Sequence, residues 1–178
     1  MAIEPYICPL DPETGSHLKL YLFKDVENVE EIRSNIVSGA WDCAAINPRL
    51  VLAPLQVATA AGRAALAARR GALVTRSPAA ELLFNLSLSK NISQSLSKFG
   101  LGTSGELLVG FIVHSEDRSE AILPQIKGEM VPIEQLRTFT DMKELKTVYK
   151  LKSLGEKSDE DLLDVIISRM VTKNFISH

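Results

Sequence analysis

The sequence predicts an α+β fold for a single domain. Segments with the two-residue period of strands and segments with the 3.6-residue period of helices are mixed rather than strictly alternating, which disfavours a doubly wound parallel sheet. The chain has 178 residues, and a domain of this size buries about 70% of its unfolded surface without needing disulfides or metals. Hydrophobic residues make up 46% and charged residues 24%, a balance typical of a folded globular protein.

Strands are expected where apolar residues alternate or run continuously. Residues 1–17 are rich in Pro, Asp, Glu, Thr and Gly and are expected to be a lead-in segment, which could include one short strand, to a domain that spans 18–178. Residues 18–24 alternate apolar and polar side chains, as in a strand with one face on the core. Residues 106–113 form the most continuous apolar run and are the best candidate for a central strand. Shorter strands are expected at 72–76 and 130–131.

Helices are expected where apolar residues recur at helical spacing between a capping residue and a terminating glycine. The expected N-terminal caps are Ser77, Asn91 and Ser158, and the expected terminating glycines are Gly39, Gly71 and Gly100. These signals predict helices over 29–38, 54–70, 78–86 and 91–99, and a last helix after Ser158 that carries the apolar residues of 162–170.

Three segments between the central strand and the last helix have weaker patterns. Residues 115–128 are expected to form a helix that Pro124 kinks or restarts. Residues 132–136 are expected to form a helical turn. Residues 142–149 carry alternating charges as in a helix, but 148–151 fits a strand equally well.

Motifs for common catalytic and cofactor chemistry are missing. The sequence has no phosphate-binding Gly-x-x-x-x-Gly-Lys loop, no dinucleotide-binding Gly-x-Gly-x-x-Gly after a strand and no Gly-x-Ser-x-Gly nucleophile motif. His17, His114 and His178 are far apart, and Cys8 and Cys43 lack Cys-x-x-Cys spacing. We therefore expect no catalytic residues, metal, cofactor or small-molecule substrate, and the sequence argues against an enzyme.

Targeting signals are also missing. The first residues lack the basic stretch and long apolar run of a signal peptide, and no window reaches 18 consecutive apolar residues, so no membrane span is expected. Two cysteines cannot make a disulfide framework. We expect a protein of a reducing compartment.

The charge is distributed unevenly along the chain. The net charge is −2 overall, but residues 60–102 carry six Lys or Arg against one acid, a net charge of +5. On the helix over 54–70, Gln56, Arg63 and Arg70 are seven residues apart and are expected to share one face. The candidate contacts to an anionic partner are Arg63, Arg69, Arg70, Arg76 and Lys90. The alternative is a solvated helix face that only offsets acidic neighbours.

Two apolar features are candidates for protein contacts. Ile92, Leu96 and Phe99 recur at positions i, i+4 and i+7 of a short helix, and Leu101 follows. This stripe could bind a partner, or it could be ordinary core packing. Trp41, the only tryptophan, lies in a loop and could anchor an interface, although packing under the loop is the commoner role.

Seven short strings, in order, carry a resemblance to one known family. They are Leu22–Val26, Ile46–Pro48, Glu81–Ser87, Asn91–Ser93, Lys98–Gly100, Tyr149–Leu151 and Leu162–Met170. None is specific alone, but together, over residues 18–175, they resemble the PRPK-binding protein family, small subunits of the KEOPS/EKC complex. The animal form is the most similar.

The resemblance implies a non-catalytic subunit with a mixed or antiparallel sheet flanked by helices. Members of this family bind a PRPK-type atypical kinase/ATPase directly. Through it they join the threonylcarbamoyl transferase and other KEOPS subunits, which make threonylcarbamoyl-adenosine in tRNAs that read codons beginning with A. Archaeal members are associated with recruiting tRNA. The resemblance also leads us to expect the nucleus and cytosol as compartments.

Carried over by position, the resemblance implies roles for two groups of residues. Ile92, Leu96, Phe99 and Leu101 become the kinase-binding candidates, and Arg63, Arg70, Arg76 and Lys90 become the tRNA-binding candidates. Archaeal and fungal relatives tend to have Arg-Gln before the isoleucine of this helix, whereas this chain has Lys90-Asn91, so kinase binding is better supported than tRNA binding. The alternatives are a stand-alone RNA-binding module and a small enzyme with an unrecognised site.

Overall fold

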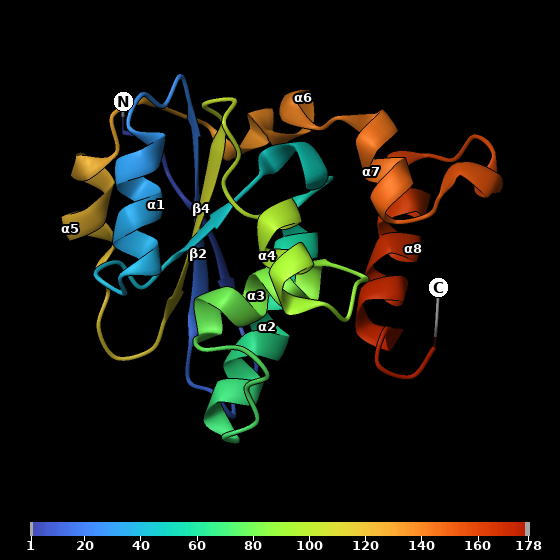
Figure 1. Ribbon diagram of the computed structural model, residues 1–178, viewed down its shortest axis with the longest axis horizontal. Helices are drawn as coiled ribbons and strands as arrows, with labels where there is room; N and C mark the ends of the chain where they lie inside the picture. Colours follow the sequence, from blue (N-terminus) through green and yellow to red (C-terminus); the bar gives the residue numbers. More distant parts are fainter. Residues whose placement is uncertain (1, 177–178) are drawn as a thin grey trace.

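An antiparallel sheet runs through the middle of the molecule, with helices on both of its faces (Figure 1). The structure is a computed structural model that describes residues 2–176. Four of the five strands in the described residues lie in the order β1-β2-β4-β3. The fifth strand, β5, pairs with residues 22–24 of β2, which follow the residues of β2 that pair with β1. The strands are β1 Tyr6–Pro9, β2 His17–Lys24, β3 Ala44–Ile46, β4 Leu107–Val113 and β5 Glu129–Val131. The predicted α+β class is confirmed, and the sheet is antiparallel throughout.

The helical elements follow the strands in an irregular order. The α-helices are α1 Val29–Val37, α2 Pro54–Arg69, α3 Pro78–Leu86, α4 Ile92–Phe99, α5 Ser119–Ile122, α6 Leu136–Phe139, α7 Met142–Val148 and α8 Asp159–Thr172. The 3-10 helices are η1 Pro48–Leu50, η2 Leu123–Gln125, η3 Ile133–Gln135 and η4 Lys152–Leu154. In Figure 1, α1 and α5 cover one face of the sheet, whereas α2, α3 and α4 cover the other, with α7 and α8 beyond them.

The alternation in β2 divides the core into two apolar clusters. Leu18, Leu20 and Leu22 point to the face covered by α2 and α3 and belong to the larger cluster. Tyr21 and Phe23 point to the opposite face and belong to the cluster under α1 and α5. Because successive side chains in a strand point to opposite faces, the pattern in 18–24 determines the two layers.

The predicted helix ends are largely confirmed. They can be predicted from the sequence because each depends on a hydrogen bond or a backbone conformation within a few residues. Ser77 Oγ accepts from the Ala80 N–H at 3.1 Å, and Ser158 Oγ accepts from the Asp161 N–H at 3.1 Å. Gly71 follows α2 with a φ of 66°, in the left-handed region that glycine adopts at helix ends.

Two predicted elements are wrong or shorter than expected. Residues 72–76 form no strand, and the chain bends at 74–76. The N–H groups of Val74 and Thr75 donate to the Glu81 carboxylate instead of to a neighbouring strand. The helix expected over 115–128 is confined to α5 and η2, and Pro124 lies in the 3-10 turn. The ambiguous segment 142–149 is helix α7, with Asp141 as its cap.

The cysteines and the tryptophan are also placed by the structure. Cys8 and Cys43 are free thiols, and Trp41 is buried in the cluster under α1, which is the loop-packing alternative. Within residues 2–176 no three His, Cys, Asp or Glu side chains are grouped as for a metal ion. No helix in that range has the length and apolarity needed to cross a membrane. His178 lies outside the described residues.

Candidate interaction surfaces

Helix α4 is fixed to the rest of the protein along its inner face. Asn91 Oδ1 accepts from the Gln94 N–H at 2.9 Å and caps the helix. Ser95 is buried, and its hydroxyl donates to the Asn91 carbonyl at 2.8 Å. Phe99 is 2% exposed and packs edge-on against Tyr149, with ring centroids 5.8 Å apart. The helix is therefore held at its start, middle and end.

The end of α4 also meets the sheet. The Phe99 carbonyl accepts from the Asn47 N–H at 2.8 Å, and Gly100 forms a bridge with Ile46. A side chain at Gly100 would not fit, because its Cβ would lie 2.4 Å from the Leu96 carbonyl oxygen. The sheet therefore fixes the position at which α4 ends.

The four residues predicted to bind a kinase lie in different environments. Ile92 and Leu96 are partly exposed, and among the described residues they belong to neither apolar cluster. Phe99 is a core residue of the larger cluster. Leu101 is partly buried against the cluster under α1, and its carbonyl accepts from Arg33 Nη2 at 2.9 Å. The structure thus leaves Ile92 and Leu96 as the partly exposed apolar side chains of α4 outside both clusters.

A hydroxyl-rich groove of about 850 Å³ lies between α4 and α7. Ser89, Ser93 and Ser97 line it, and the Lys98 ammonium bonds to the Glu144 carboxylate at 2.5 Å from one helix to the other. Serine hydroxyls and an ion pair can hydrogen-bond to a polar partner. This groove extends the α4 surface with polar groups.

Lys173, which the sequence analysis missed, holds the turn in front of α4. Its ammonium donates to the carbonyls of Phe84, Ser87 and Ser89 at 2.5, 2.9 and 3.2 Å. It also lies 3.5 Å from the centroid of the Phe84 ring. Burial, reinforced by the nearby charge of Arg63, lowers the pKa of Lys173 to about 8. No local sequence signal could have shown this role, because its partners are 84 to 89 residues away.

Gln56 is not on the basic face of α2, contrary to its predicted position. It is fully buried and joins a polar network: its side-chain oxygen accepts from the Leu52 N–H at 2.8 Å. Its side-chain nitrogen donates to the Leu50 carbonyl at 3.0 Å and to the Tyr149 hydroxyl at 2.9 Å. Gln56 lies in the first turn of a helix that follows a buried loop, so its face packs inward.

The four residues predicted to bind tRNA separate along the α2–α3 pair. The two helices are antiparallel: Asn85 near the end of α3 donates to the Ala60 carbonyl in the first half of α2. Arg70 and Arg76 are therefore at the end where α2 leads into α3, whereas Lys90 follows the opposite end of α3. Arg63 lies close enough to Lys173 to affect its pKa, which places it on the side of Lys90.

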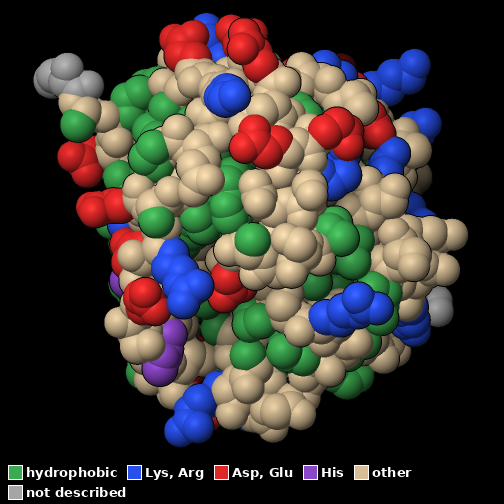
Figure 2. All heavy atoms as spheres, turned by 60° about the vertical axis from the view of Figure 1, so that its left-hand side comes forward, with side chains coloured by type: hydrophobic (Ala, Val, Ile, Leu, Met, Phe, Trp, Pro, Cys, Tyr) green, Lys and Arg blue, Asp and Glu red, His purple; other side chains and the backbone are tan. Residues whose placement is uncertain are grey.

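The charge of Arg70 is already paired, since its guanidinium bonds to the Glu13 carboxylate at 2.9 and 3.0 Å. Arg76 and Lys90 are exposed. On the face drawn in Figure 2, basic side chains are scattered among acidic, apolar and uncharged groups and form no continuous strip. The predicted strip is thus two groups, of which Arg63 and Lys90 lie nearer to α4.

Comparisons with known proteins agree on one family. A family described as kinase binding protein CGI-121 matches residues 23–174. A protein of Danio rerio named EKC/KEOPS complex subunit TPRKB is 32% identical over 156 residues, covering 86% of this chain and 89% of that protein. A protein of Aspergillus fumigatus named EKC/KEOPS complex subunit cgi121 is 32% identical over 154 residues, covering 81% of this chain and 80% of that protein.

Proposed function

Because the chain belongs to the CGI-121 family of kinase-binding proteins, we propose that it binds a PRPK-type kinase/ATPase as a non-catalytic subunit of the EKC/KEOPS complex. The names of the similar Danio and Aspergillus proteins support membership of that complex. The kinase would be the direct partner, and the threonylcarbamoyl transferase and other subunits would be reached through it.

The observation that carries the proposal is the structure of α4. Its inner face is fixed by Ser95 and Phe99, whereas Ile92 and Leu96 remain partly exposed outside both clusters. A rigid helix that presents branched apolar side chains loses little conformational freedom on binding, so the buried area contributes more fully to affinity. We assign direct contact to Ile92 and Leu96 and to the exposed part of Leu101, with Phe99 supporting the helix from the core.

The test is the affinity for the purified kinase of the same organism, for the wild type and for Leu96→Glu. A charge placed against an apolar partner surface is desolvated without a counter-charge, so we expect at least about 30-fold weaker binding. The matched control is Val37→Glu, a substitution at an 81% exposed apolar residue of α1. Circular dichroism establishes that both variants fold. Equal affinities for the wild type and Leu96→Glu would move the kinase surface away from α4.

We propose further that the complex modifies adenosine to threonylcarbamoyl-adenosine in tRNAs that read codons beginning with A, and that this chain helps to recruit them. Arg63 and Lys90 are the strongest candidates for phosphate contacts, since they lie on the α4 side and within residues 2–176 neither takes part in an ion pair. Arg70 and Arg76 are secondary candidates.

The salt dependence of tRNA binding tests this second proposal. Each phosphate contact that is lost lowers the slope of log K against log salt concentration by about 1. We therefore expect shallower slopes for Arg63→Gln and Lys90→Gln, and an unchanged slope for Arg118→Gln, an exposed arginine beside α5. Binding that persists without the kinase would favour a stand-alone RNA-binding module. Equal slopes for all variants would exclude tRNA from this surface.

We propose the nucleus and the cytosol as the compartments of the protein, on the basis of its family. Fractionation of cells with an antibody to this chain tests the assignment, and recovery mainly with membranes or in the medium would contradict it.

A further inference from the structure

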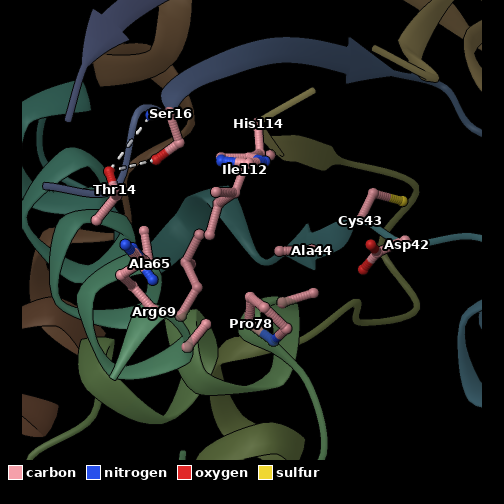
Figure 3. Close-up of a pocket in the computed structure, with 14 residues that line it drawn as sticks. Thr14, Ser16, Asp42, Cys43, Ala44, Ala65, Arg69, Pro78, Ile112 and His114 are labelled. Atoms are coloured by element: carbon pink, nitrogen blue, oxygen red, sulfur yellow. Dashed lines mark hydrogen bonds between the residues drawn. The ribbon is translucent and has the colours of Figure 1, made fainter. Parts of the chain in front are cut away.

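A second hollow lies beside the C-terminal end of α2, and the proposed function does not use it. It has a volume of about 330 Å³ and lies between the sheet and the α2–α3 pair. Figure 3 shows Ile112 of β4 pointing into it between Ala44, Ala65 and Pro78. This size is at the lower end of the range of small-ligand sites in proteins.

Small side chains on three elements create this space. Ala44 of β3, Gly110 of β4, and Ala65 and Ala68 of α2 all line it, so the sheet and the helix are separated without side chains that fill the gap. A Cβ at Gly110 would lie 3.3 Å from Leu20 Cδ2, so a side chain there would require Leu20 to shift by a few tenths of an ångström. The floor of the hollow is therefore apolar, compact and built from the rigid part of the fold.

One rim of the hollow carries a cation, the Arg69 guanidinium, whose N–H groups can donate hydrogen bonds to a ligand. Arg69, the last residue of α2, lines the hollow, and Figure 3 places it on the same side as Thr14. Its Nε reaches the Glu13 backbone carbonyl at a long 3.4 Å, whereas the Glu13 carboxylate is bonded to Arg70. Within residues 2–176, Arg69 takes part in no ion pair. A planar guanidinium beside an apolar surface is suited to a carboxylate.

The rest of the rim consists of Thr14 and Ser16 on one side and Asp42 on the other, and it favours one orientation of a bound anion. The hydroxyls of Thr14 and Ser16 lie 2.7 Å apart, and Thr14 Oγ1 donates to the Asp11 carbonyl at 2.6 Å, which fixes the β1–β2 turn. Asp42 lies at the opposite side of the hollow in Figure 3 and makes no hydrogen bond or ion pair within the described residues. An anion bound here would be attracted by Arg69 and repelled by Asp42.

We infer that this hollow is a binding site for a small carboxylate with a compact apolar body. The apolar part occupies the floor formed by Ala65, Ala68 and Ile112, and the carboxylate points to Arg69. The inference does not depend on kinase or tRNA binding, because the hollow is lined neither by Ile92 and Leu96 nor by the tRNA-binding candidates Arg63, Arg70, Arg76 and Lys90.

The test uses phenylacetate as the probe and phenylacetamide as its neutral counterpart, titrated into the ¹⁵N-labelled full chain. We expect phenylacetate to shift the amide signals of Ala44, Ala68 and Gly110, with a dissociation constant on the order of 1 mM for a ligand of this size. Phenylacetamide and the Arg69→Gln variant should each bind about 10-fold more weakly, because a charge-assisted hydrogen bond is lost. The control variant is Arg118→Gln.

Variants that fill the hollow test its location. Ala68 is half-buried on a helix, so Ala68→Leu should fold and abolish binding, and Ala79→Leu gives the same test from α3 if the first variant is unstable. The inference is overturned if phenylacetate shifts no signal around the hollow, if the amide binds as well as the acid, or if a folded filled variant binds like the wild type.

Discussion

The Lys173 ammonium bonds to the carbonyl of Phe84 near the end of α3 and to those of Ser87 and Ser89 in the segment that leads into α4. Replacement by methionine keeps most of the side-chain volume but leaves these buried acceptors without their donor. We expect Lys173→Met to lower the free energy of unfolding by about 2–4 kcal/mol, measured by urea denaturation. Lys157→Met, at an exposed lysine, is the control and should change it by less than about 0.5 kcal/mol. Equal effects of the two substitutions would show that the Lys173 bonds contribute little.

Asp117 gives an acid-side prediction. Its bonds to the Lys19 ammonium at 2.6 Å and to Ser119 lower its pKa to about 2. A carboxyl whose folded pKa is lowered stabilises the fold above its unfolded pKa, near 4, and this stability is lost as the pH falls through about 2. Because the Asp117 side chain is 34% exposed, solvent screening limits the loss to about 1 kcal/mol.

Stability measured from pH 5 to pH 2 should therefore fall more steeply for the wild type than for Asp117→Asn, by about 1 kcal/mol over the range. Asp164→Asn, at a carboxyl of α8 for which the described residues offer no ion pair, serves as the control. Parallel pH profiles for the wild type and Asp117→Asn would contradict the assigned ion pair.

The two thiols should differ in reactivity. Burial, with a smaller effect of the Asp42 charge, raises the pKa of Cys43 to about 12, and in Figure 3 its sulfur points away from the hollow. Cys8 is only partly buried. Because the thiolate is the reactive form, a disulfide reagent at neutral pH should label one thiol in the native protein and the second only on unfolding. Cys8→Ser should remove the fast reaction, and a fast reaction that persists would show that Cys43 is accessible.

At the scale of single elements, Glu81 connects the α2–α3 loop to α3. The carboxylate is buried and accepts from the N–H groups of Val74 and Thr75, and from the Thr75 hydroxyl at 2.6 Å. Glu81→Ala removes these acceptors, and we expect a loss of about 2–3 kcal/mol in the free energy of unfolding, with faster amide exchange at 72–76. Glu160→Ala, at an exposed acid, is the control. Unchanged exchange at 74 and 75 would contradict the bonds.

The elements that the sequence predicts correctly are those with local causes. Ser77, Asn91 and Ser158 bond to backbone groups three residues away, so the cap is visible in the sequence. The strand predicted at 72–76 fails because an acid six or seven residues later takes its backbone donors. Propensity describes the pairing that a segment can make with itself or a neighbouring strand, and it does not include a competing side chain.

The candidate surfaces follow the same division. The spacing of Ile92 and Leu96 indicates an apolar stripe, and the structure leaves both partly exposed. The same spacing includes Phe99, which is buried because Tyr149 and the sheet meet it from distant parts of the chain. The face of Gln56 was predicted wrongly for the same reason. Periodicity determines which residues share a face, but the partners of that face determine whether it is exposed.

At the scale of the whole molecule, a buried polar network joins the helices on one side of the sheet. The Tyr149 hydroxyl, at the end of α7, accepts from Gln56 of α2 and donates to the Leu86 carbonyl of α3 at 2.6 Å. Arg169 of α8 donates to the Tyr149 carbonyl at 2.6 Å. Partners of the hydroxyl are 93 and 63 residues away, so this assembly forms only when the chain has folded.

Tyr149→Phe tests how much this network stabilises the helices on its side of the sheet, and whether the two faces of the sheet unfold together. The variant leaves the Leu86 carbonyl without its hydroxyl donor, and we expect the free energy of unfolding to fall by about 1–3 kcal/mol. Tyr21→Phe removes a hydroxyl from the other face of the sheet and should cost less. Trp41 fluorescence reports the cluster under α1, whereas far-UV circular dichroism follows all helices, including those around Tyr149.

If the sheet couples its two faces, both signals should shift together to lower urea concentration in Tyr149→Phe, as in a two-state transition. The coupling has a structural basis, because Leu22 and Phe23 are adjacent in β2 yet belong to opposite clusters. A circular dichroism transition that precedes the Trp41 transition would instead show that the helices carrying the α4 surface unfold separately from the α1 face.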